Sequence, residues 1–177
     1  MTWEEQLFSL LDDLEQQAEA AYDAERDVDL ADRSRAEYAQ VTLASRLMAS
    51  LQDEVVLEVR GVGQVHGTLC RVGEGWCLVQ GSGQDWVLRT DVITLVRGAS
   101  ERSVPEVAWS PVARLGFGSA LRRIADTRDP CVIHRIDGRH HDVMLTRVGR
   151  DFVEAAGADA KLLLFPFATL AAVQSRD

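Results

Sequence analysis

A chain of 177 residues, 46% of them hydrophobic, can bury the core of one compact domain or of two small ones. It has no apolar run near the roughly 18–20 residues that cross a bilayer, and its N-terminus lacks the basic start and apolar stretch of a signal peptide. We therefore expect a cytoplasmic protein.

The net charge of −9 resides mostly in residues 1–52, with 12 acidic and 4 basic side chains. Such a segment repels nucleic acid and anionic membranes.

Residues 1–42 are predicted to form an acidic helical arm. Residues 3–51 contain no Gly or Pro and are rich in residues that lose little side-chain freedom in a helix. Leu7, Leu11 and Leu14 recur at spacings of four and three residues, which is typical of a short coiled coil or a helical hairpin. Two alternatives stay open. The arm packs on the rest of the chain, or these leucines form a self-association or partner-binding surface.

Two later segments, residues 55–98 and 132–173, share one pattern of alternating apolar residues, which is the period of a β-strand. Glycines mark the turns between the expected strands. A short helix is predicted before each segment, the first at the end of a helix over residues 30–51 and the second at residues 119–125. The matched positions are Leu69 with Leu145, Arg71 with Arg147, Gly73 with Gly149, Trp76 with Phe152, Leu88 with Phe165, Ile93 with Leu170 and Val96 with Val173.

The sequence therefore predicts an α+β protein in which the helical arm is followed by two tandem small β-barrels, each a closed sheet of about five strands. The expected parts are the arm at residues 1–42, a helix and first barrel at 43–98, a strap at 99–118, and a helix and second barrel at 119–174. The strap is too apolar for a free linker, and we expect Trp109 to anchor it on a barrel.

The order of a helix, a strand, a strand with the pattern G-x-L-x-x-V-G, and a closing V-L-R-x-x-x-I-x-x-V resembles the Sm-like fold, a small SH3-like β-barrel found in Sm and LSm proteins and in the RNA chaperone Hfq. The residues that carry the resemblance are Gly67, Leu69, Val72, Gly73, Trp76, Leu78, Val87, Ile93 and Val96, and in the second segment Leu145, Val148, Gly149, Phe152, Leu170 and Val173.

The positions next to the RNA pocket of that family depart from its pattern. The Asp and Asn of Sm proteins are replaced by Gly73 and Cys77 in the first segment. The Lys-His pair of Hfq is replaced by Arg89-Thr90 and Pro166-Phe167. The resemblance therefore implies the fold and does not carry RNA binding across.

The whole chain also resembles actinobacterial proteins that are sometimes labelled Fis-family regulators. A Fis-type protein needs a C-terminal helix-turn-helix with a basic recognition helix. Here residues 162–167 have the character of a strand, and the last 17 residues contain only Lys161 and Arg176 as cations. The sequence therefore does not support that label.

No residue pattern predicts catalysis or a cofactor. Three cysteines without C-x-x-C spacing argue against a zinc site, and Cys70 and Cys77, placed symmetrically about a turn, are either small buried hydrophobes or a cross-strand disulfide. Histidines at positions 134, 140 and 141 are expected in a solvated turn, because adjacent strand residues point to opposite faces. We expect a non-enzyme that binds neither metal nor cofactor.

The region from residue 119 to 150 is the most basic, with 7 arginines and 4 acidic residues. Arginine suits phosphate contacts and protein interfaces alike. The leading hypothesis is a cytosolic protein-interaction or scaffold module that binds a protein partner or a second copy. The alternative is a regulator that binds RNA or DNA through this region. The candidate residues for either partner are Arg122, Arg123, Arg135, Arg139, Arg147 and Arg150.

Overall fold

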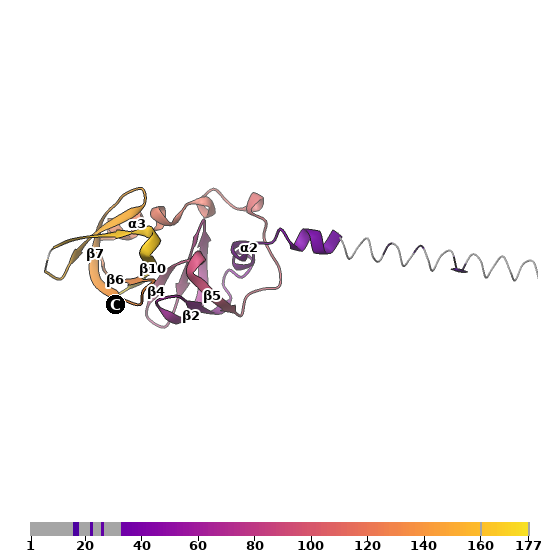
Figure 1. The fold of residues 1–177 in the computed structure, drawn as a ribbon, viewed down its shortest axis with the longest axis horizontal. Coiled ribbons are helices and arrows are strands. Elements are labelled where there is room, and N and C mark those ends of the chain that lie inside the picture. Colours follow the sequence, from indigo (N-terminus) through magenta and orange to yellow (C-terminus); the bar gives the residue numbers. More distant parts are fainter. Residues whose placement is uncertain (1–15, 18–21, 23–25, 27–32, 160, 177) are drawn as a thin grey trace, which may run out of the picture. The chain divides into compact units, whose positions relative to one another are not determined.

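The protein is described here from a computed structural model, which places residues 16–17, 22, 26, 33–159 and 161–176 (Figure 1). The chain divides into two compact units, residues 1–41 and residues 42–177. The described part of the first unit contains a helical segment at residues 33–38. The predicted contacts of Leu7, Leu11 and Leu14 lie outside the described residues. None of the described helices is long and apolar enough to span a membrane.

The second unit is a mixture of helices and strands, and this confirms the predicted α+β class. Its described elements, in chain order, are α2 (Leu43–Met48), β1 (Glu54–Val59), β2 (Gly63–Gly73), β3 (Trp76–Gln80), β4 (Asp85–Arg89), the 3₁₀ turn η1 (Thr90–Val92), β5 (Ile93–Arg97), η2 (Glu106–Ala108), η3 (Val112–Arg114), α3 (Phe117–Thr127), β6 (Pro130–Arg135), β7 (His140–Val148), β8 (Phe152–Gly157), β9 (Leu162–Pro166), η4 (Phe167–Thr169) and β10 (Leu170–Ser175).

Helix α2 begins at a capping box. The Thr42 hydroxyl accepts a hydrogen bond from the Ser45 backbone N–H at 3.1 Å, and the Ser45 hydroxyl oxygen accepts one from the Thr42 backbone N–H at 3.1 Å. These two bonds satisfy N–H groups that a helix leaves free at its start. The prediction of one helix over residues 30–51 was therefore wrong, because the helical segment ends at residue 38 and a new helix starts at Leu43.

The ten described strands form one antiparallel sheet in the order β5-β1-β2-β3-β4-β10-β6-β7-β8-β9. The prediction of two separately closed barrels was wrong on this point. Within the first half, β4 does not return to pair with β5. It pairs instead with β10 of the second half, through Leu88 with Ala172, Val87 with Val173 and Trp86 with Gln174. The hydrogen-bonding groups of β4 are thus satisfied by the other half of the chain.

The two halves have the same strand order, since β5-β1-β2-β3-β4 is repeated as β10-β6-β7-β8-β9. Their irregularities also coincide. The pairing register shifts between Leu69 and Arg71 in β2, and between Leu145 and Arg147 in β7. These are positions that the sequence comparison had matched. The turns η1 and η4 likewise occupy the same place before the last strand of each half.

Two clusters of buried side chains stabilise the unit. The first contains Leu47 of α2 and the inward residues of β1 to β3, and Trp109 of the strap joins it with its indole N–H donating to the Val104 carbonyl at 3.0 Å. The second contains Leu121 of α3 and the inward residues of β6 to β9. The clusters meet at the β4–β10 junction, because Val87 of β4 belongs to the second cluster while Ala172 of β10 belongs to the first.

Candidate functional site

The ends of the sheet are β5 and β9. A strand at the end of a sheet presents a row of unpaired N–H and C=O groups and can pair with another strand. Strand β9 also presents apolar side chains, with Leu162 62% exposed and Leu164 59% exposed. Leu95 of β5 is 39% exposed. Both edge strands are five residues long, and their exposed leucines present apolar surface beside the unpaired backbone groups.

Within the molecule, the edge of β4 is covered by β10, a strand of the other half. The side chain of Val87 is 8% exposed, although its counterpart in the second half, Leu164, is 59% exposed. The Asp85 backbone N–H donates to the Ser175 hydroxyl at 2.8 Å, and the Arg89 guanidinium donates to the Leu170 carbonyl at 3.1 Å. The same strand position is therefore buried where a neighbour is present and exposed where the sheet ends.

On one face of the junction, polar and aromatic side chains form a row across four strands. The ring of His134 lies 5.2 Å from that of Trp86 and 6.0 Å from that of His140. The His134 Nε2 atom lies 2.7 Å from the Gln174 side-chain oxygen. Burial lowers the pKa of His134 below 6.5; the hydrogen bond to Gln174 opposes this shift and His140 adds to it.

The expected solvated histidine turn is thus only partly found. His134 is half-buried in this row, and the Nε2 atom of His141 is buried without a hydrogen-bond partner among the described residues, with its ring 5.3 Å from that of Phe165. No group of three potential metal ligands occurs among the described residues.

We predict that acid destabilises the junction through His134. Because the folded state lowers the pKa of this group, the unfolded chain binds the proton more readily. Stability from this histidine is therefore fully present above pH 6.5 and is lost as the pH falls below that value. Urea unfolding of the wild-type chain at a series of pH values should show this fall in the free energy of unfolding. In His134→Gln, the free energy of unfolding should depend less on pH. A His134→Gln variant whose stability falls with acid as steeply as that of the wild-type chain would contradict the assignment.

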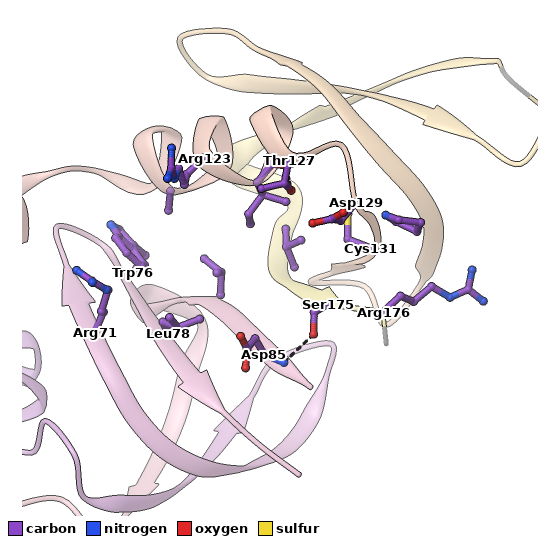
Figure 2. A pocket seen from close by; sticks show the side chains of 15 residues that line it. Arg71, Trp76, Leu78, Asp85, Arg123, Thr127, Asp129, Cys131, Ser175 and Arg176 are labelled. Carbon is purple, nitrogen blue, oxygen red and sulfur yellow. Dashed lines mark hydrogen bonds between the residues drawn. The ribbon is translucent and has the colours of Figure 1, made fainter. Parts of the chain in front are cut away.

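A pocket of about 460 Å³ lies on the opposite side of the junction, between α3 and strands β2, β3, β4, β6 and β10. Its floor is apolar and includes Leu78, Val87 and Ile124. Figure 2 shows Arg71 and Trp76 on the strands at one end, with Arg123 on α3 across from them. Asp85, Ser175 and Arg176 lie at the other end (Figure 2).

The three cysteines are free, so the alternative of a disulfide between Cys70 and Cys77 was wrong. Cys77 pairs with Val72, whereas Cys70 lies at the register shift of β2. Burial raises the pKa of Cys77 to about 12, and burial raises that of Cys131 to about 11 against a backbone hydrogen bond from Leu145. Cys70 is half-buried, which leaves it as the accessible thiol for chemical labelling.

The structure does not gather the six candidate arginines into one surface. Arg135 and Arg139 flank the β6–β7 turn, whereas Arg147 and Arg150 lie at the other end of β7, roughly 25–30 Å away for a strand of this length. Two of the six are ion-paired, Arg135 with Asp137 at 3.0 Å and Arg147 with Glu154 at 2.7 Å. Arg122 and Arg123 are on α3.

No family model and no curated protein matches this chain. The candidate site therefore rests on the geometry described above.

Sequence reasoning missed the two sheet edges and the junction pocket. The buried run from Leu170 to Val173 was a usable signal for the junction, because four consecutive apolar residues are typical of a strand that is buried on both faces. The matching stretch of β5 contains Thr94 and Arg97 and lacks such a run. No sequence signal shows which strand of the other half pairs with β10.

Proposed function

We propose that the chain is a non-enzymatic cytosolic interaction module, formed by two diverged Sm-like copies that are fused through one sheet, and that it assembles with other copies through its free edges. The observation that carries the proposal is the β4–β10 junction. This junction joins the fourth strand of one half to the fifth strand of the other. The two free edges, β9 and β5, are again a fourth and a fifth strand, so the same pairing can continue between molecules.

The internal pairing fixes the register of the proposed contact. Inside the chain, Val87 pairs with Val173. The counterparts of these residues are Leu164 on β9 and Val96 on β5, so we expect Leu164 of one copy to lie opposite Val96 of the next. The contact joins unlike surfaces, and such head-to-tail contacts generate rings or filaments.

The alternative, a regulator that binds nucleic acid, receives less support from the geometry. Arg135 and Arg147 are each within 3.0 Å of a carboxylate oxygen, and these ion pairs weaken the positive field that a phosphate backbone would meet. The remaining candidates lie on different elements. The free edges, in contrast, present apolar side chains together with unpaired backbone groups.

We predict that Leu164→Lys abolishes assembly without unfolding the protein. Lysine on an edge strand blocks pairing with another sheet. Because Leu164 is exposed, its replacement should lower the free energy of unfolding by about 1 kcal/mol or less. Light scattering after size exclusion would measure the mass. Because Leu7, Leu11 and Leu14 are a second candidate self-association surface, the measurement uses a chain in which these three leucines are serine.

The matched control is Thr146→Lys, which introduces the same charge on β7, away from both edges. The control should assemble like the parent chain. A parent chain that is monomeric at all accessible concentrations, or a Leu164→Lys variant that assembles like the control, would contradict the proposal.

A further inference from the structure

A second hollow lies beside the junction pocket, and we call it the strap groove. It has a volume of about 840 Å³ and lies between α2, β2, α3 and the part of the strap that precedes α3. Its lining is largely apolar and includes Met48, Leu51, Val104, Val112 and Leu115. Val112 is 59% exposed and Leu115 is 46% exposed, so the groove presents apolar side chains at the surface.

Two arginines are the charged residues that line the strap groove. Arg71 extends from β2 and Arg123 from α3, and none of the described residues that line the groove is acidic. Neither arginine forms an ion pair with any residue that the structure describes. The groove therefore combines an apolar floor with two cations that have no ion-pair partner in the described part of the chain.

A comparison of the two halves shows that Arg71 lacks a partner that its counterpart has. In the second half, Arg147 pairs across the strands with Glu154, and their side chains form an ion pair at 2.7 Å. In the first half, Arg71 pairs across the strands with Leu78. The partner position of Arg71 is thus apolar and lines the adjoining pocket. Arg71 has no such partner among the described residues, so its guanidinium can bind an external carboxylate without first losing an ion pair.

We propose that the strap groove binds the acidic segment at residues 3–18 of a second copy of this chain. This segment has five acidic residues and no basic one, and it places Leu7, Leu11 and Leu14 at helical spacing. Its leucines match the apolar floor, and its carboxylates match Arg71 and Arg123. Amphipathic helices bind apolar grooves in this manner, with anchors at spacings of three and four residues. The contact does not depend on the edge pairing proposed above.

Alkylation of Cys70 tests the proposal, because this half-buried thiol lines the groove and the other two cysteines are buried with a raised pKa. The full chain is treated with N-ethylmaleimide over a range of protein concentrations, with and without a synthetic peptide of residues 1–20. At a peptide concentration of ten times its dissociation constant, about a tenth of the grooves stay free, so alkylation of Cys70 should slow about tenfold. Protection should also increase with the concentration of the chain alone.

Matched variants identify the contacts. Arg123→Gln should lose most of the protection by the peptide, whereas Arg122→Gln, the neighbouring residue outside the lining of the groove, should keep it. A peptide with serine in place of Leu7, Leu11 and Leu14 should not protect Cys70. The rate with peptide is compared with the rate without peptide in each variant, so any direct effect of a substitution on the thiol cancels.

Three results would overturn the proposal. Alkylation at the same rate with and without peptide would show that the groove does not bind the segment. If the peptide protected Cys70 in Arg123→Gln as well as in the wild-type chain, the positive charge of Arg123 would have no role in binding the segment. Protection of the full chain that persists unchanged on dilution would assign the groove to a segment of the same molecule. Leu164→Lys should retain the protection, so a failure of this inference can be told apart from a failure of edge pairing.

Discussion

Replacing Ala172 with aspartate should lower the free energy of unfolding of the second unit by about 4 kcal/mol, because it buries a charge without a partner. Ala172 is fully buried in the central strand β10. Its backbone pairs with Leu88 of β4 on one side and with His134 of β6 on the other. The carboxylate would therefore lie where both halves of the sheet meet. Urea unfolding followed by circular dichroism would measure the effect.

The matched control for this variant is Leu95→Asp. Leu95 occupies the same position of the fifth strand in the first half, but it lies on the free edge β5 and is 39% exposed. At concentrations where the chain is monomeric, the same carboxylate there stays in contact with water and should cost about 1 kcal/mol or less. Equal losses of stability in the two variants would contradict the view that the β4–β10 junction is structurally central.

The Gly67→Ala substitution should destabilise the protein by about 3 kcal/mol, although it adds a single methyl group. A Cβ atom at Gly67 would lie 2.1 Å from the Gln80 carbonyl oxygen and 2.9 Å from the Gly81 Cα atom. Both are backbone atoms, so no side chain can rotate away to relieve the overlap. Strands β2 and β3 would have to separate at this point. Thermal unfolding would measure the loss.

Gly116→Ala is the control for Gly67→Ala, since a Cβ atom at Gly116 would meet nothing within 4 Å. Gly116 is the N-cap of α3, a position where alanine is less favourable than glycine, so we expect a cost of about 1 kcal/mol or less. If Gly67→Ala unfolded at the same temperature as the control, the close approach of β2 and β3 would not be a property of the folded protein.

The strands themselves were largely predictable from the sequence. The matches of Leu88 with Phe165 and of Ile93 with Leu170 fall on equivalent positions of β4 with β9 and of β5 with β10. The alternation of apolar residues carries this information because it reports which face of a strand is buried. The sequence also predicts that glycines mark the turns, and Gly61 and Gly63, both with a positive φ, lie where β1 connects to β2.

The pairing between the halves was not predictable. Alternation in β4 is the same whether this strand closes a barrel or pairs with a distant strand, because backbone hydrogen bonds leave no trace in the side-chain pattern. The start of α2 was missed for another reason. Thr42 and Ser45 have the spacing of a capping box, but the helix-favouring residues on both sides hid this signal.

The residues that line the strap groove could not be predicted from the sequence either. The matched arginines Arg71 and Arg147 look alike, and only the strand register shows that Leu78 faces one and Glu154 the other. The candidate arginines were predicted because they lie close together in the sequence. Residues that are close in sequence can lie far apart in the folded chain. The structure separates Arg139 from Arg150 by the length of β7.

A mixing experiment tests the head-to-tail assembly most directly. In the background that replaces Leu7, Leu11 and Leu14 with serine, Leu164→Lys blocks β9 and Leu95→Asp blocks β5. Each variant alone should be monomeric. An equimolar mixture should form a complex with twice the mass of one chain and no larger species, because one intact β9 edge meets one intact β5 edge. A mixture that stays monomeric, or variants that assemble by themselves, would contradict the account.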